Sequence, residues 1–306
     1  MKRLKNRLKP IFNIGEARTF AIAEEVSKAT GTRAFAKVRI ADVITIENSG
    51  ISDDLYRYAL SAHFDVLVCK EDGLPHLAIE FDGGGHSTKN DERKEIICGI
   101  FRLPMVRVGP QHIEASVFED TAIAFLVWQL YCVDAFLAEY GNDPYEYYDP
   151  LFFVAVPGKD RNWPFAYRER WLGRLTRRFR ESFERFEDDL RDSYKHGILQ
   201  FGAIYGTWQR EGEFRSFVAQ KVANDAVVWG EAELGLKVYG LDDRRLSAFY
   251  EVSTFVQGMA AERMYHEALE FLAGNCEPTN LSVVVEKVKC WEAEGFSLRA
   301  AMNFSR

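Results

Sequence analysis

Acidic residues in the first third of the chain have a spacing that suits metal chemistry. Glu80 and Asp82 stand two residues apart in the stretch Leu77–Asp82, and Asp65 lies in the neighbouring stretch Phe64–Cys69. Side chains two apart on a β-strand emerge on one face, where a carboxylate from the next strand can approach them. Three convergent carboxylates form a hard-oxygen site for Mg²⁺ or Mn²⁺. Such an ion can generate hydroxide and stabilise the transition state of phosphodiester hydrolysis.

A β-hairpin is expected to bring these carboxylates together. The two stretches are joined by Lys70-Glu71-Asp72-Gly73, and Asp-Gly is a strong signal for a tight turn between antiparallel strands. Hydrophobic periodicity and turn residues predict the elements around this hairpin. They are helices over Glu16–Ser27 and Asn90–Phe101, strands over Ala34–Ile40 and Met105–Val108, and an irregular insertion over 46–60 with a short helical piece.

Four short motifs follow one another along these elements. They are His63-Phe64-Asp65-Val66-Leu67-Val68, Ala78-Ile79-Glu80-Phe81-Asp82-Gly83 with His86, Asp91-Glu92-Arg93-Lys94, and Leu103 to Val108. In this order they resemble the PD-(D/E)XK (restriction-endonuclease-like) nuclease superfamily, over about residues 16–108. Within it the chain most resembles a poorly characterised bacterial branch near the very-short-patch-repair-like nucleases. The resemblance implies an α/β (α+β) core with a mixed central sheet and Mg²⁺-dependent (or Mn²⁺-dependent) hydrolysis of phosphodiester bonds.

The resemblance also implies roles for individual residues. Asp65 matches the first motif acid and Glu80 the second, and Phe81 is expected to offer its backbone carbonyl to the metal. The motif lysine would fall at position 82, where this chain has Asp82. Some members of the superfamily also carry an acid there, and in that reading Asp82 completes the site or holds a second ion.

Three further residues are candidates for the same site. Other members move the motif lysine to the following helix, where Lys94 stands three residues after Asp91 and so on the same face. Glu16 matches a helix-borne acid of the superfamily, and His86 would orient water or contact phosphate. Two simpler readings stay open, in which Lys94 pairs with Asp91 and Glu16 is a solvated helix residue.

Beyond about residue 115 the pattern changes to one that predicts long helices. We expect a nuclease-like domain over 1–115, a helical connector over 116–150, and a mainly α-helical domain of unknown role over 151–306. Helices are expected near 165–195, 213–234, 243–273 and 281–294.

The helix expected near 165–195 carries seven arginines between Arg168 and Arg185. Arginine neutralises backbone phosphate without reading sequence, so this helix is a candidate nucleic-acid-binding surface. The residues we assign to it are Arg170, Arg174, Arg177 and Arg178. The alternative is a solvated helix whose arginines pair with acidic residues on the same segment.

Composition describes a globular chain, with 47% hydrophobic and 28% charged residues. The five cysteines form neither a disulfide framework nor a zinc spacing, and no signal peptide or bilayer-spanning stretch is readable. We therefore expect a cytoplasmic protein without a membrane partner. The net charge of −7 does not by itself suggest a nucleic-acid binder, although a total charge says nothing about local basic patches.

Together these observations predict a metal-dependent nuclease that acts on nucleic acid, with DNA expected rather than RNA, in phage defence or DNA processing. The alternative is a nuclease fold that has lost catalysis and serves as a nucleic-acid-binding or protein-interaction module. Asp82 in place of the motif lysine keeps this alternative open. The C-terminal region would then offer the surface for a homo-oligomer or a partner protein.

Overall fold

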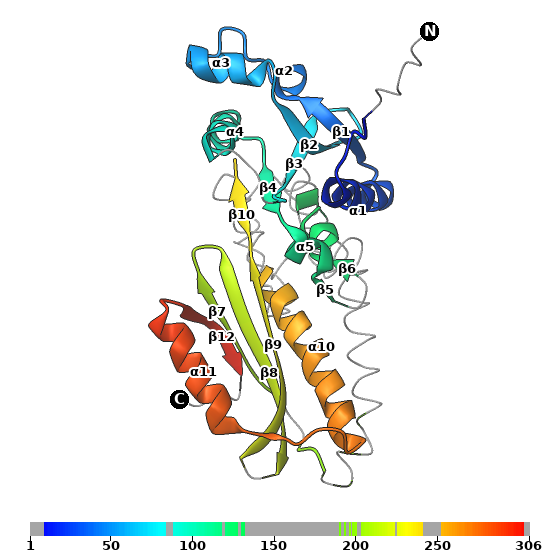
Figure 1. Cartoon of the computed structure of the whole chain (residues 1–306), viewed down its shortest axis with the longest axis vertical. Helices are drawn as coiled ribbons and strands as arrows, with labels where there is room; N and C mark the ends of the chain where they lie inside the picture. The colour runs from blue at the N-terminus through cyan, green and yellow to red at the C-terminus, as the bar shows by residue number, and fades with distance from the viewer. Residues whose placement is uncertain are drawn as a thin grey trace, which may run out of the picture. The chain divides into compact units, whose positions relative to one another are not determined.

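A computed structural model of the chain describes the positions of most residues (Figure 1). The described residues are 9–83, 88–117, 120–127, 130–131, 190, 193, 196, 198–200, 203–223, 225–240 and 252–302. The chain divides into two compact units. The first unit is Met1–Ile113 together with Val238–Leu241, and the second unit is Glu114–Lys237 together with Asp242–Arg306.

The first unit contains a five-stranded mixed sheet in the order β1-β2-β3-β4-β10. The strands are β1 (Arg33–Arg39), β2 (His63–Cys69), β3 (Pro75–Phe81), β4 (Met105–Val108) and β10 (Lys237–Tyr239). The first three pair antiparallel, and β3 pairs parallel with β4. The mixed sheet and the antiparallel hairpin are confirmed. Its turn contains the Asp-Gly pair, with Gly73 at a φ of 84°.

Five helices lie in the described part of the N-terminal segment. They are α1 (Ile14–Thr30), α2 (Ile40–Val43), α3 (Asp53–Ala59), α4 (Thr88–Phe101) and α5 (Pro110–Glu114). The side chain of Asn13 caps the first turn of α1, and Glu16 completes a capping box by accepting from the Asn13 amide. Helix α4 makes the crossover that the parallel β3–β4 pair requires.

Strands β2 and β3, which are neighbours in this sheet, are almost wholly buried. Every residue of β2 after His63 and every residue of β3 after Pro75 is buried. Apolar side chains such as Phe64, Leu67 and Ala78 account for most of this burial. Asp65 and Glu80 are buried in the same strands, so their carboxylates need hydrogen-bonding or charged partners.

In its described residues, the second unit contains a five-stranded antiparallel sheet and two long helices. The strands, in sheet order, are β11 (Thr279–Asn280), β9 (Ala226–Gly235), β8 (Glu213–Ala223), β7 (Ile204–Arg210) and β12 (Ser297–Met302). The helices are α10 (Val252–Leu272) and α11 (Leu281–Ala293). A two-stranded ladder of β5 (Ser116–Val117) and β6 (Asp120–Thr121) accompanies them.

The helix predicted over 213–234 is wrong, because this segment forms the hairpin β8–β9. Helix α10 covers one face of the hairpin, where a side chain at Gly230 would overlap the backbone of the helix. Helix α11 covers the other face, where Phe217 belongs to the same core as Trp291. A strand buried on both faces loses the polar alternation by which strands are recognised.

Other helix predictions for the C-terminal region fare differently. The helix over 281–294 is confirmed as α11, and α10 covers the described part of the helix predicted over 243–273. In the described residues the region is therefore a mixture of sheet and helix, and its mainly α-helical character is not confirmed. The helix predicted near 165–195 lies outside the described residues. No helix among those described is both long and apolar enough to cross a bilayer.

Candidate functional site

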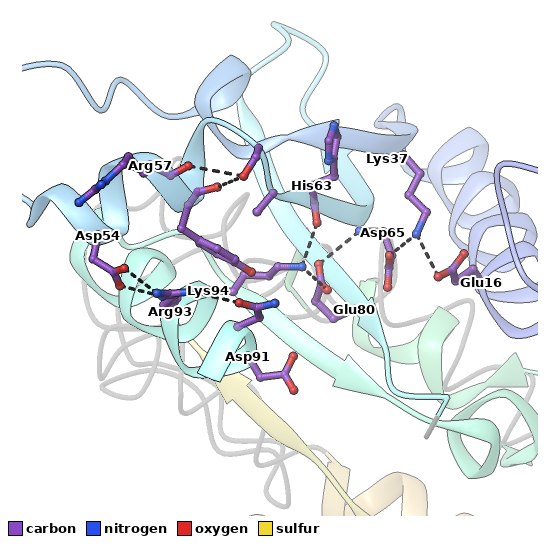
Figure 2. Close-up of a pocket in the computed structure, with 14 residues that line it drawn as sticks. Glu16, Lys37, Asp54, Arg57, His63, Asp65, Glu80, Asp91, Arg93 and Lys94 are labelled. Carbon is purple, nitrogen blue, oxygen red and sulfur yellow. Dashed lines mark hydrogen bonds and ion pairs between the residues drawn. The ribbon is translucent and has the colours of Figure 1, made fainter. Parts of the chain in front are cut away.

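An open pocket of about 950 Å³ lies beside β2 and β3 in the first unit (Figure 2). Six elements or their flanking residues supply its walls: α1, β1, α3, β2, β3 and α4. The lining residues are Glu16, Lys37, Asp54, Arg57, Tyr58, Ser61, Ala62, His63, Asp65, Glu80, Asn90, Asp91, Arg93 and Lys94. Charged residues of both signs dominate this wall, so the pocket is suited to a polar or ionic ligand.

Asp65 and Glu80 meet where β2 and β3 lie side by side. The backbone amide of Asp65 donates to Oε1 of Glu80 at 3.2 Å. The backbone amide of Phe81 donates to Oδ2 of Asp65 at 3.0 Å. Each carboxylate therefore accepts a hydrogen bond from the backbone of the neighbouring strand, which fixes the two acids beside each other as the hairpin predicted.

Lys94 reaches this pair from α4. Its Nζ atom lies 2.5 Å from Oε2 of Glu80 and donates to the carbonyl of His63 at 2.9 Å. Asp91, one turn earlier on the helix, instead forms an ion pair with Arg107 at 3.2 Å. The structure thus places Lys94 against Glu80 (Figure 2) and not in the alternative pair with Asp91.

Glu80 has an unusual protonation equilibrium for a carboxylic acid. Burial raises its pKa to about 7, the nearby charge of Asp65 adds to the rise, and Lys94 opposes it. A group with this pKa exchanges its proton near neutral pH, which is a property of catalytic acids and bases and of buried ion pairs alike.

Lys37 and Glu16 complete the acidic side of the pocket. The Nζ atom of Lys37 lies 2.5 Å from Oδ1 of Asp65 and 3.0 Å from Oε1 of Glu16. Burial alone would lower the pKa of Lys37, but its hydrogen bonds to Asp65 and Glu16 raise it. Glu16 is therefore at the site and is not merely a solvated helix residue. Lys37 belongs to none of the sequence motifs, although its position on the strand next to that of Asp65 is a usable signal.

Asp82 does not join Asp65 and Glu80. It follows the last residue of β3, and its carboxylate lies 3.0 Å from Arg107 of β4. Arg107 is buried, and it also pairs with Asp91 and with Glu95. Burial would lower the pKa of Arg107, but these three carboxylates raise it. A third acid beside Glu80 would add repulsion, whereas Arg107 offers Asp82 a favourable partner.

Several predicted site residues cannot be placed. His86 and the arginines assigned to nucleic-acid binding, Arg170, Arg174, Arg177 and Arg178, lie outside the described residues. Within the ranges that the structure describes, no group of three or more His, Cys, Asp or Glu residues is arranged to hold a metal ion. The predicted convergence of three carboxylates on one ion is thus not found there.

Two carboxylates nevertheless fit the chemistry of Mg²⁺. This ion keeps several of its waters and is often held by one or two carboxylates together with phosphate oxygens of a substrate. Asp65 and Glu80 supply such a pair in a pocket open enough for a ligand. The backbone of Phe81 borders the pair, since its amide donates to Asp65.

Comparison with known proteins adds one finding. Residues 8–123 match the model of a family described as a protein of unknown function (DUF2726). All the residues that line the pocket fall within this segment, while β10 falls outside it. No curated protein and no solved structure matches the chain.

Proposed function

We propose that the chain is a metal-dependent phosphodiesterase, a nuclease with DNA as the expected substrate. The observation that carries this proposal is the contact between Lys94 and Glu80 beside Asp65, in a pocket open to solvent. Two acids on adjacent strands and a lysine from the following helix form the set of groups that the motif order predicts. The cellular setting we propose is phage defence or DNA processing.

In this proposal each side chain has a defined task. Asp65 and Glu80 would hold Mg²⁺, which supplies an activated water and stabilises charge on the phosphate. Lys94 presents a positive charge beside Glu80, where it can orient the attacking water or stabilise the developing charge on a phosphate oxygen. Because the His63 carbonyl holds the same ammonium group, Lys94 is positioned before a substrate arrives.

Two arginines line the part of the pocket formed by α3 and α4. Arg93 forms a two-point contact with Asp54, with distances of 2.8 and 2.5 Å, and Asn90 also accepts from its guanidinium. Arg57 is exposed on the same wall and donates to the carbonyl of Asp53. Arginine side chains at the edge of a site can contact successive phosphates of a nucleic acid without reading its sequence.

A cleavage assay tests the proposal directly. The full-length protein would be incubated with linear duplex, circular duplex and single-stranded DNA and with RNA, in Mg²⁺, Mn²⁺ or EDTA. Asp65→Asn and Glu80→Gln should each lower the rate by about 100-fold or more, because each removes a charge that the ion requires. Asp72→Asn in the exposed hairpin turn is the matched control and should cleave normally. Absence of cleavage with every metal, or cleavage that persists in both site variants, would overturn the assignment.

One observation favours a second candidate, a catalytically inactive nucleic-acid-binding or protein-interaction module. Lys37 and Lys94 already neutralise Asp65 and Glu80, and Asp82 faces Arg107. Such a module would bind labelled DNA in EDTA as tightly as in Mg²⁺ and would not cleave it. Anisotropy measurements in both conditions therefore separate the two candidates.

A further inference from the structure

Lys37 stands between two acids that come from different elements. Its Nζ atom contacts Oδ1 of Asp65 on β2 and Oε1 of Glu16 on α1, at 2.5 and 3.0 Å (Figure 2). The side chain is 29% exposed and lines the pocket. A positive charge placed between two carboxylates occupies the position that a bound cation would take between them.

The backbone at this position has a conformation that side-chain-bearing residues rarely adopt. Lys37 has a φ of 50°, in the left-handed region, although it lies within β1. The residues on either side keep the strand register, with Ala36 opposite Val66 and Val38 opposite Phe64. The departure is thus confined to one residue, and such local strain persists only where the surroundings fix it. The two carboxylates are the contacts that hold this side chain in place.

The two lysines of the pocket differ in their freedom to move. Lys94 is buried, with a side chain 10% exposed, and the His63 carbonyl holds it as well as Glu80. Lys37 is more exposed, and its ammonium group pairs with the side chains of Glu16 and Asp65. If one ammonium group must leave its carboxylate when another cation arrives, Lys37 is the group that can turn into the pocket.

The charges in the pocket disfavour binding of a divalent ion to Asp65 while the Lys37 ammonium group stays there. Glu16, Asp65 and Glu80 with Lys37 and Lys94 leave one formal negative charge. A divalent ion on Asp65 would share Oδ1 with the Lys37 ammonium, and two cations at that separation repel strongly in a partly buried site.

We propose that Lys37 is a tethered competitor of the divalent ion. Its ammonium neutralises Asp65 while the site holds no metal, leaves Oδ1 when the ion binds, and then contacts a phosphate of the nucleic acid. This inference rests on the proposed function, since it takes Asp65 as a metal ligand. Removing the ammonium group has two consequences of opposite sign: the ion binds more tightly and the nucleic acid binds more weakly.

Calorimetric titration with Mn²⁺ alone tests the first consequence on the full-length protein. Lys37→Met should bind Mn²⁺ about tenfold more tightly than the unaltered protein, because the competing charge is gone. Lys37→Arg keeps the charge and should stay within about threefold. Lys28→Met is the matched control, since Lys28 pairs with Glu24 on the exposed face of α1 and lies outside the pocket.

Binding of labelled duplex DNA in Ca²⁺ tests the second consequence. Lys37→Met should weaken binding and reduce the slope of log affinity against log salt by about one, as expected for the loss of one phosphate contact. Lys28→Met should leave that slope unchanged.

Thermal unfolding shows whether each variant is folded. Lys37→Met should unfold at a lower temperature in EDTA, because Glu16 and Asp65 then repel, and Mn²⁺ should raise its midpoint more than that of the unaltered protein. If this variant does not fold, Lys37→Gln replaces it, with the same expectations.

The outcomes separate this inference from the proposed function. Equal or weaker Mn²⁺ binding by Lys37→Met, in a protein that does bind Mn²⁺, overturns the role of Lys37 and leaves the nuclease proposal standing. An unchanged slope of log DNA affinity against log salt in Lys37→Met would also overturn the role of Lys37 and leave the nuclease proposal standing. Absence of Mn²⁺ binding in both proteins overturns the inference and the proposed metal site together.

Discussion

The ammonium group of Lys94 lies 2.5 Å from the Glu80 carboxylate, and both side chains are buried, at 10% and 5% exposure. Removing one partner of a buried ion pair leaves the other charge without compensation, which typically costs about 3–5 kcal/mol. Glu80 can limit this cost by taking up a proton, because its pKa is already raised to about 7. The stability of the pair should therefore depend on pH.

Lys94→Met is expected to lower the free energy of unfolding by about 3 kcal/mol at pH 8 and by much less at pH 5, where Glu80 is protonated. The double variant Lys94→Met with Glu80→Gln should recover a large part of the loss at pH 8. Urea unfolding of the metal-free protein measures the free energy of unfolding of the unaltered protein, the single variant and the double variant. Lys89→Met, on an exposed position of the same helix, is the control. An equal loss at both pH values would contradict this account.

Glu80 should make the metal-free protein less stable as the pH rises. Burial raises the pKa of Glu80 to about 7 in the folded chain, above the ordinary value of 4.5. Between these values the folded state binds more protons than the unfolded state, so the free energy of unfolding falls as pH increases. The fall amounts to roughly 3 kcal/mol across the window.

Urea unfolding in EDTA at several pH values from 4 to 8 checks this sign. The difference between the unaltered protein and Glu80→Gln isolates the contribution of this carboxyl group. If the unaltered protein instead became more stable relative to Glu80→Gln as the pH rises, the pKa of Glu80 would be lowered in the folded chain.

Arg107 is expected to be essential for folding of the first unit. Its buried guanidinium is the shared partner of Asp82, Asp91 and Glu95. Arg107→Met would leave these three carboxylates without that cation, and we expect a loss of about 3–5 kcal/mol or more in the free energy of unfolding. Arg39→Met is the control, because Arg39 pairs with Asp42 in solvent. A small effect at Arg107 in urea unfolding would show that water replaces the guanidinium.

Gly240 follows β10 and should tolerate no side chain. It has a φ of 69°, and a Cβ atom there would overlap the carbonyl oxygen atoms of Leu103 and Cys98. Gly240→Ala should therefore detach β10 and accelerate amide hydrogen exchange in β4. Gly31→Ala is the matched control, with a φ of 72° and open space around the added atom, and should cost only about 1 kcal/mol. Equal exchange in β4 for both variants would argue against this role of the glycine.

Local signals account for the parts of the fold that the sequence predicted well. The Asp-Gly turn and two apolar stretches placed β2 beside β3, and the hairpin in turn placed Asp65 near Glu80. The spacing from Asp91 to Lys94 put both on one helix face. That face lies over the sheet, where Asp91 contacts Arg107 and Lys94 contacts Glu80.

Other features depend on contacts that one sequence does not reveal. Asp82 was assigned to the acidic site because it alternates with Glu80, but the strand ends at Phe81 and the next residue pairs with Arg107. The left-handed backbone of Lys37 could not be predicted, because the position is not occupied by glycine or asparagine, which adopt this conformation more readily. The hairpin β8–β9 was hidden because helices cover both of its faces.

Strand β10 also sets the order in which the first unit can be completed during synthesis. It pairs with β4, yet Lys237 follows Val108 by 129 residues (Figure 1). At a translation rate of about 5–20 residues per second, the edge of β4 stays without this partner for roughly 10 s on the ribosome. An unpaired strand edge can join with other chains, so the nascent protein passes through a period of exposure to aggregation that ends only when most of the chain has been made.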